Sequence, residues 1–100
     1  MMATTVVQYR VKPERAEENQ QLIKAVFAEL DRSEPEGFTY KVFLLEDGVS
    51  FVHVVIEHDD ADHPHSLQAL PAFQAFVADI VDRCDVPPVA KGATVVGGFR

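Results

Sequence analysis

The sequence has no tryptophan and only one cysteine, Cys84. A single cysteine excludes an intrachain disulfide and any metal cage built from cysteines. No apolar run approaches the roughly 18 residues of a membrane-spanning helix, so we expect no membrane partner. The first residues lack the basic segment and apolar stretch of a secretory signal, so we expect a cytoplasmic protein.

Positive charge is also scarce. Nine Lys and Arg residues stand against sixteen Asp and Glu residues, which gives a formal net charge of −7. A surface of this sign repels polyanions, and we therefore expect no nucleic-acid partner. A chain of 100 residues with 47% hydrophobic content is typical of one folded domain, so residues 1–100 are predicted to form a single domain.

The stretch around Asp47-Gly48 predicts a hairpin that organises the rest of the chain. Two apolar runs, residues 38–46 and 49–58, flank this pair. Asp-Gly between such runs is the strongest short-range hairpin signal, because a type I′ turn needs positive φ at both central residues. The resulting register pairs Val42 with His53.

This register places every second residue of the hairpin on the same face. One face carries Phe38, Tyr40, Val42, Leu44, Phe51, His53, Val55 and Glu57. The other face carries Thr39, Lys41, Phe43, Leu45, Ser50, Val52, Val54 and Ile56. Neither face is polar enough to lie in water, so both faces are predicted to be covered.

The rest of the chain predicts two strands and two helices. Residues 4–12 alternate as a strand, and Pro13 leads into a helix that ends near Arg32. Pro71 begins a second helix, which Pro87-Pro88 must end, and residues 93–99 are predicted as the last strand. The apolar stripe of the first helix comprises Asn19, Leu22, Ile23, Val26, Phe27 and Leu30, and that of the second comprises Phe73, Phe76, Val77, Ile80, Val81 and Cys84.

The order strand, helix, strand, strand, helix, strand predicts a ferredoxin-like α+β fold. This βαββαβ arrangement has a four-stranded antiparallel sheet with both helices on one face. The helices would cover the aromatic face of the hairpin and leave Phe43, Val52, Val54 and Ile56 bare in a monomer. A bare apolar sheet face normally marks an interface, so we expect a homodimer with two stacked sheets.

The chain resembles the dimeric α+β barrels of the antibiotic-biosynthesis monooxygenase-like family. The resemblance is carried by residues 11–14, the Gly37-Phe38 start of a strand, residues 54–61 and residues 70–76. It implies a homodimer with a small-molecule pocket between each sheet and its helices. Relatives oxidise aromatic polyketides with oxygen and no cofactor, and another branch degrades haem.

Two departures from this family concern its chemistry. Relatives use a tryptophan late in the third strand together with an asparagine, and Glu57 stands at that place here. The haem branch needs a histidine on the second helix, where this sequence has Phe76 and Val77. We therefore expect no haem degradation and no cofactor, while cofactor-free oxygenation of a phenolic or quinol-like aromatic stays open.

His53 is the strongest candidate for a catalytic residue. A histidine titrates near neutral pH, so His53 could be a general base or an oxyanion partner. A buried histidine bonded to a neighbour, or one at the dimer interface, is the structural alternative. Glu57 points to the same face and is a second catalytic candidate, although it could lie in water at the pocket rim.

Five further residues are candidates for the pocket wall. Tyr9 and Tyr40 could position an aromatic ligand by stacking and hydrogen bonding, or could simply be core residues. Asn19 either lines the pocket or begins the helical stripe. Phe51 and Phe76 complete the predicted aromatic lining.

Residues 58–65 contain ligand types for zinc, with three histidines and three aspartates. Their spacing matches no zinc motif, so we interpret them as a solvated loop and expect no bound metal. Cys84 is interpreted as a small buried hydrophobe. Three functions stay open from the sequence: a small-molecule enzyme of the cofactor-independent monooxygenase kind, a non-catalytic dimeric binding module, and an assembly subunit.

Overall fold

The computed structural model describes residues 3–33, 37–57 and 66–99. The predicted loop at 58–65 lies outside these residues. The described elements follow the predicted βαββαβ order. They are β1 (Ala3–Val11), the 3-10 turn η1 (Pro13–Arg15), α1 (Ala16–Ser33), β2 (Phe38–Leu44), β3 (Ser50–Glu57), the 3-10 turn η2 (Ser66–Ala69), α2 (Pro71–Ala78), α3 (Ile80–Arg83) and β4 (Cys84–Ala93).

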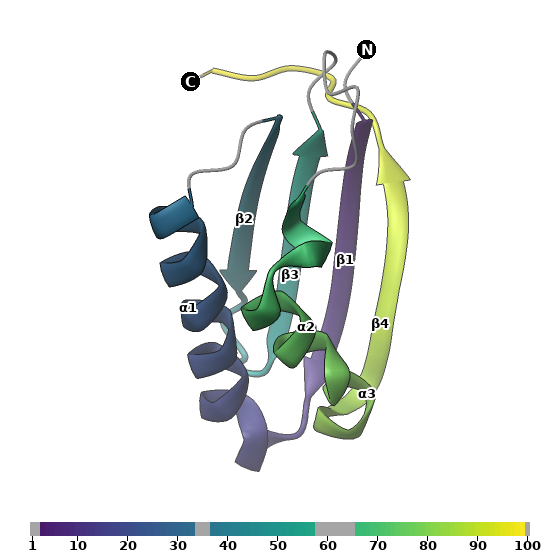
Figure 1. The fold of residues 1–100 in the computed structure, drawn as a ribbon. Helices are drawn as coiled ribbons and strands as arrows, with labels where there is room; N and C mark the ends of the chain where they lie inside the picture. Colours follow the sequence, from purple (N-terminus) through teal and green to yellow (C-terminus); the bar gives the residue numbers. More distant parts are fainter. Residues whose placement is uncertain (1–2, 34–36, 58–65, 100) are drawn as a thin grey trace.

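The strands form one antiparallel sheet in the order β2-β3-β1-β4. All the helices lie on one side of this sheet, with α1 in front of β2 and α2 in front of β3 (Figure 1). The ferredoxin-like α+β fold predicted from the sequence is confirmed. The core lies between the sheet and the helices, and its buried apolar members are Tyr9, Val11, Ile23, Val26, Phe51, Leu67, Leu70, Phe76 and Cys84.

The hairpin has the predicted strand register but a different turn. Val42 pairs with His53 and Leu44 with Phe51, as expected. The predicted type I′ turn is wrong, because the amide of Gly48 donates to the carbonyl of Leu45 and thus centres the turn one residue earlier. The Asp47 carboxylate accepts from the backbone amides of Val49 and Ser50, which stabilises a longer loop and shortens both strands.

The first helix agrees with its predicted stripe. It runs to Ser33, and Asn19, Ile23 and Val26 are buried against the sheet. Pro13 stands at the first position of the preceding 3-10 turn, where its missing amide hydrogen costs nothing. The Arg15 guanidinium forms ion pairs with Glu18 and Asp79 at the surface.

The second helical segment departs from the prediction. The helix is interrupted at Asp79, which has φ −125°, and α3 adds only four residues. This break rotates the stripe beyond Asp79, so Val81 is exposed by 66%, while Val77, which precedes the break, is exposed by 42%. Arg83 is instead buried, and Cys84 already belongs to the next strand.

The last strand also lies earlier than predicted. It spans Cys84–Ala93 and passes through Pro87-Pro88, while residues 94–99 form no regular element. A strand at the edge of a sheet tolerates proline, because its outward amides have no ladder partner. Its register against β1 shifts near Arg10, which is where the prolines interrupt the regular pairing.

Candidate functional site

His53 lies in the middle of β3 and points to the helices. It is paired with Val42 on β2 and with Val7 on β1, and 5% of its surface is exposed. Each ring nitrogen lies 2.7 Å from a tyrosine hydroxyl, Nε2 from that of Tyr9 and Nδ1 from that of Tyr40. The sheet thus brings two of the predicted pocket residues onto His53.

Aromatic rings fix these polar groups in place. The His53 ring stacks on Phe76 with a centroid distance of 5.3 Å. Tyr9 stacks on Phe51 at 5.6 Å, and Tyr40 stacks on Phe27 at 5.0 Å. Such pairs restrict each ring to one orientation, so the hydroxyl groups are held where they meet the imidazole.

The apolar surroundings keep the site uncharged near neutral pH. Burial lowers the pKa of His53 to about 4, since the charged imidazolium loses its hydration. Burial also raises the pKa of Tyr9 and of Tyr40 above the ordinary value for a phenol. At pH 7 the imidazole and both phenols are therefore neutral, and the imidazole carries one N–H.

A buried polar chain continues from Tyr9 to the end of α3. The side-chain amide of Asn19 donates to the Tyr9 hydroxyl at 3.0 Å, and its carbonyl accepts from Arg83 Nε at 3.0 Å. Both Asn19 and Arg83 have no exposed surface. Arg83 was not among the residues predicted from the sequence, although its spacing of seven from Phe76 and three from Ile80 continues the helical stripe.

A cavity of about 200 Å³ adjoins the imidazole on the helix side of the sheet. Its surface is apolar throughout, so Tyr9, Tyr40 and His53 line it with ring carbons and not with their hydroxyl groups or ring nitrogens. It is formed by Val7, Tyr9, Tyr40, His53, Val55, Leu67, Phe73, Phe76, Val77, Ile80 and Pro88.

The predicted site residues divide into two groups around this cavity. Tyr9, Tyr40, His53 and Phe76 line it. Asn19 and Phe51 stand one step behind, because each contacts the Tyr9 side chain instead. Glu57 ends β3, paired with Ala3 and Phe38, and is not among the lining residues.

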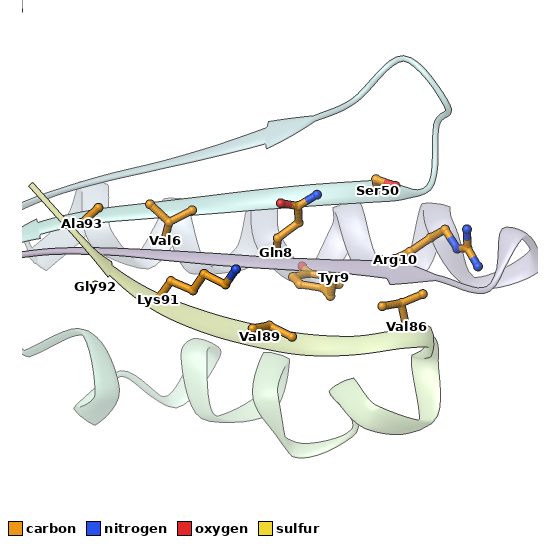
Figure 2. Close-up of a pocket in the computed structure, with 10 residues that line it drawn as sticks. All are labelled: Val6, Gln8, Tyr9, Arg10, Ser50, Val86, Val89, Lys91, Gly92 and Ala93. Carbon is orange, nitrogen blue, oxygen red and sulfur yellow. The ribbon is translucent and has the colours of Figure 1, made fainter.

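The opposite side of the sheet carries few large aromatic groups and no helix. We name as the outer face the residues Val6, Gln8, Arg10, Lys41, Phe43, Val52, Val54, Ile56, Val89 and Lys91, which the strand register places together. Figure 2 shows an open groove on the β1 and β4 part of this face, including Val6, Gln8 and Lys91. Phe43 is 49% exposed and Val89 is 50% exposed, so this face is partly bare in a single chain.

The described part of the chain has neither a metal-binding cluster nor a membrane-spanning helix. Residues 3–33, 37–57 and 66–99 contain no group of three or more His, Cys, Asp or Glu side chains that could hold a metal ion. None of the helices in these ranges is both long and apolar enough to cross a membrane.

The fold and the cavity under its helices define a class of small α+β protein that is known from solved structures. No protein-family model and no curated protein matches the sequence. A structure named antibiotic biosynthesis monooxygenase shares 21% identity over 95% of this chain and 99% of its own, with a TM-score of 0.72. A Bacteroides thetaiotaomicron VPI-5482 protein for which that activity is proposed shares 20% identity over 99% and 94% of the two chains, with a TM-score of 0.79.

A third solved structure has no activity in its name. Rv0793 from Mycobacterium tuberculosis shares 14% identity over the full length of both chains, with a TM-score of 0.74. At these identities the likenesses show a common fold. The chain therefore has the fold of the proteins named antibiotic biosynthesis monooxygenases, which confirms the resemblance at the level of architecture.

Proposed function

We propose that this protein is a cofactor-independent monooxygenase that acts on a small phenolic or quinol-like aromatic in the cavity beside His53. The observation that carries this proposal is the cavity itself, an apolar space whose lining residues include His53 and the two tyrosines that bond to it. Apolar pockets with a few placed polar groups are typical of small-molecule sites. The fold shared with proteins named for such an activity supports the same choice.

The size of the cavity limits which substrates can fit. A cavity of about 150 Å³ is known to hold benzene. The 200 Å³ beside His53 therefore fits an aromatic of one or two rings better than a polycycle. The stacked rings of Phe76 and Tyr40 offer flat surfaces for such a compound.

The proposed reaction needs no added reductant. A phenol that has lost its proton donates electrons to O2, and a ring C–H opposite the hydroxyl, or beside it in a 1,4-quinol, becomes a new carbonyl of a quinone. One oxygen atom ends in the product and the other leaves as water, so the substrate supplies all four electrons. The protein's part is to bind the ring, exclude water and stabilise the charge on the substrate oxygen.

The contacts of His53 favour the role of oxyanion partner over that of direct base. Both of its ring nitrogens already face tyrosine hydroxyls at 2.7 Å, so a substrate proton would have to displace one of them. Tyr40 both contacts His53 and lines the cavity with its ring, so the proposed role requires its hydroxyl to turn towards the substrate oxygen when the substrate binds. Glu57 has no part in this proposal.

The outer face supports a homodimer as the working form. Stacking two such faces would cover the exposed Phe43 together with Val52, Val54 and Ile56, which are half-buried in one chain. A specific interface buries roughly 1,200 to 2,000 Å². The cavity lies on the opposite side of the sheet and so stays accessible in such a dimer.

Oxygen consumption tests the proposed reaction. We expect turnover with at least one member of a panel of single-ring quinols, naphthols and anthrone-like ketones, and no turnover by His53→Ala. His53→Phe should keep the fold and fill the cavity, and it should also be inactive. Gln21→Ala, on the exposed side of α1, is the matched control and should keep full activity.

The same experiment separates the alternative function. Ligand binding without oxygen consumption for every compound would contradict the enzyme and favour a dimeric binding module. Binding of no compound at all would contradict both, and the assembly subunit would then be the better explanation.

A further inference from the structure

The cavity beside His53 is closed at one end and open at the other. Four of its lining residues have at most 5% of their surface exposed, namely Tyr9, His53, Leu67 and Phe76. Val77 also lines the cavity, yet 42% of its surface is exposed, and no other lining residue in the described ranges is exposed to this degree. A side chain that borders both a cavity and water marks the place where the two meet. The cavity therefore reaches solvent beside Val77.

Val77 lies near the end of α2, just before the helix breaks at Asp79. Ile80, the first residue of α3, lines the cavity on the other side of this break. The Asp79 carboxylate accepts from Arg15 Nη2 at 2.9 Å, which ties the break to the turn η1 in front of α1. The break is thus anchored at the surface, and the two apolar residues that flank it have a defined position at the cavity wall.

The wall opposite α2 is formed by the edge strand β4. Pro87 and Pro88 both stand between the β4 residues that pair with Gln8 and Arg10, so two residues of β4 face Tyr9 alone. This is the arrangement of a β-bulge, which changes the direction of side chains on the bulged strand. Pro88 lines the cavity, and its ring fixes the local backbone. In the sheet order β4 comes last, and Figure 1 shows it as the outermost strand on the side away from α1.

We propose that Val77, Ile80 and Pro88 form the mouth of the cavity at the β4 edge of the sheet, and that Val77 sets the size of the aromatic ligand that enters. The inner surface is apolar throughout, so the ligand must enter as an uncharged ring, because a charged group would lose its hydration there. This inference deepens the proposed function and rests on it, since it names the residue that determines the specificity of that cavity.

Val81 offers a matched control for Val77. The two residues are of the same type and lie four positions apart, and both are exposed, Val81 by 66%. Val81 is not among the lining residues of the cavity. Substitutions at exposed positions usually change stability little, so we expect variants at both positions to fold. Any difference between them then reports contact with the cavity.

Two hydrocarbons test the size limit. Benzene has one ring and naphthalene has two, and neither has a polar atom that needs a partner from Tyr40 or His53. Val77→Ala removes two methyl groups from the cavity wall. By titration calorimetry we expect this variant to raise the affinity for naphthalene relative to benzene by roughly tenfold, which corresponds to the burial of about two carbon atoms. Val81→Ala should keep the ratio of the unmodified protein.

A larger side chain tests the place of entry. Val77→Trp should narrow the mouth without touching the buried end of the cavity. We expect the exchange of benzene between cavity and water, measured by NMR, to slow by at least about tenfold in this variant, which corresponds to a barrier raised by about 1.4 kcal/mol. Val81→Trp should leave the exchange rate unchanged. If Val77→Trp does not fold, the affinity ratio of Val77→Ala still decides the question.

Three results would overturn the proposal. Equal exchange rates in Val77→Trp and Val81→Trp would place the entrance elsewhere. An unchanged affinity ratio in Val77→Ala would mean that Val77 does not limit ligand size. Failure of the unmodified protein to bind either hydrocarbon would leave the mouth without a ligand to select. None of these measurements depends on turnover, so failure to consume oxygen would defeat the proposed reaction and leave them as they are.

Discussion

The two faces of the sheet use the same four strands for different purposes. The helix face is closed, with Phe51 and His53 almost fully buried and every described polar group of the site bonded to another. The outer face is open, with Phe43 half-exposed and Lys41 and Lys91 flanking a central stripe of valines. Alternation along a strand separates these environments by a single residue, so neighbours such as His53 and Val54 meet entirely different surroundings.

This difference agrees with a division of roles in which the helix face carries the proposed chemistry and the outer face the proposed association. A buried polar network has one arrangement, because each donor and acceptor depends on the next. An apolar surface without such a network specifies little beyond the need to be covered. Substitutions on the outer face should therefore change stability in a way that depends on protein concentration, because they act on the dimer. Substitutions on the helix face should change stability equally at every concentration.

The largest expected effect is on the outer face. Val54→Asp should place an unpaired charge between the two stacked sheets and remove the dimer at micromolar concentration. Light scattering should report one chain of 11.1 kDa in place of two. Val54→Ile keeps the face apolar and is the control. A dimeric Val54→Asp protein of unchanged stability would mean that the face is not the interface.

A pair of phenylalanines compares the faces directly. Phe51→Ala removes a ring with 1% exposure that stacks on Tyr9, and it should cost about 3–5 kcal/mol in the free energy of unfolding at any protein concentration. Phe43→Ala should cost less than about 1 kcal/mol in dilute monomer and more when the dimer forms. Urea denaturation at several protein concentrations measures both. Equal concentration dependence in the two variants would contradict the comparison.

A further expected effect concerns pH and belongs to the helix face. The pKa of His53 is near 4 in the folded protein against 6.5 in the unfolded chain, so the unfolded state binds more protons between these values. Stability is therefore full above pH 6.5 and falls as the pH drops towards 4, by about 3 kcal/mol from this residue.

Denaturation at pH 7 and at pH 4.5 measures this effect as the difference between the unmodified protein and His53→Phe. The subtraction removes the contributions of the three other histidines and of the carboxylates, which both proteins share. A variant with the same pH dependence as the unmodified protein would mean that His53 is not buried as a neutral group.

Much of the fold follows from the periodic spacing of apolar residues, which is visible in the amino-acid sequence itself. Alternation along 38–44 and 50–57 predicted the side of the sheet on which His53 lies, and the position of Asp47-Gly48 predicted the register of β2 and β3. The spacing of Asn19, Ile23 and Val26 predicted the buried side of α1. These features depend on neighbours within a few residues, so local patterns are enough to predict them.

The errors came where tertiary context outweighed local preference. Pro87-Pro88 is typical of a stop signal, yet the edge strand accepts both residues, because its outward amides need no partner and the register shift near Arg10 interrupts the ladder on the inner side. Val81 belongs to an apolar stripe in the sequence, but the break at Asp79 turned it to solvent. Neither the sheet edge nor the helix break has a local signature strong enough to predict.

The candidate site divides in the same way. The sequence by itself determined that His53, Tyr40 and Phe51 share a face and that Asn19 lies on the buried side of the first helix. Only the tertiary structure decided that Tyr9 meets His53 from 44 residues away and that Arg83 meets Asn19 from 64 residues away. Hydrogen bonds between distant side chains depend on atomic positions, and the packing of the helices on the sheet determines these positions. The spacing of residues along the chain does not predict them.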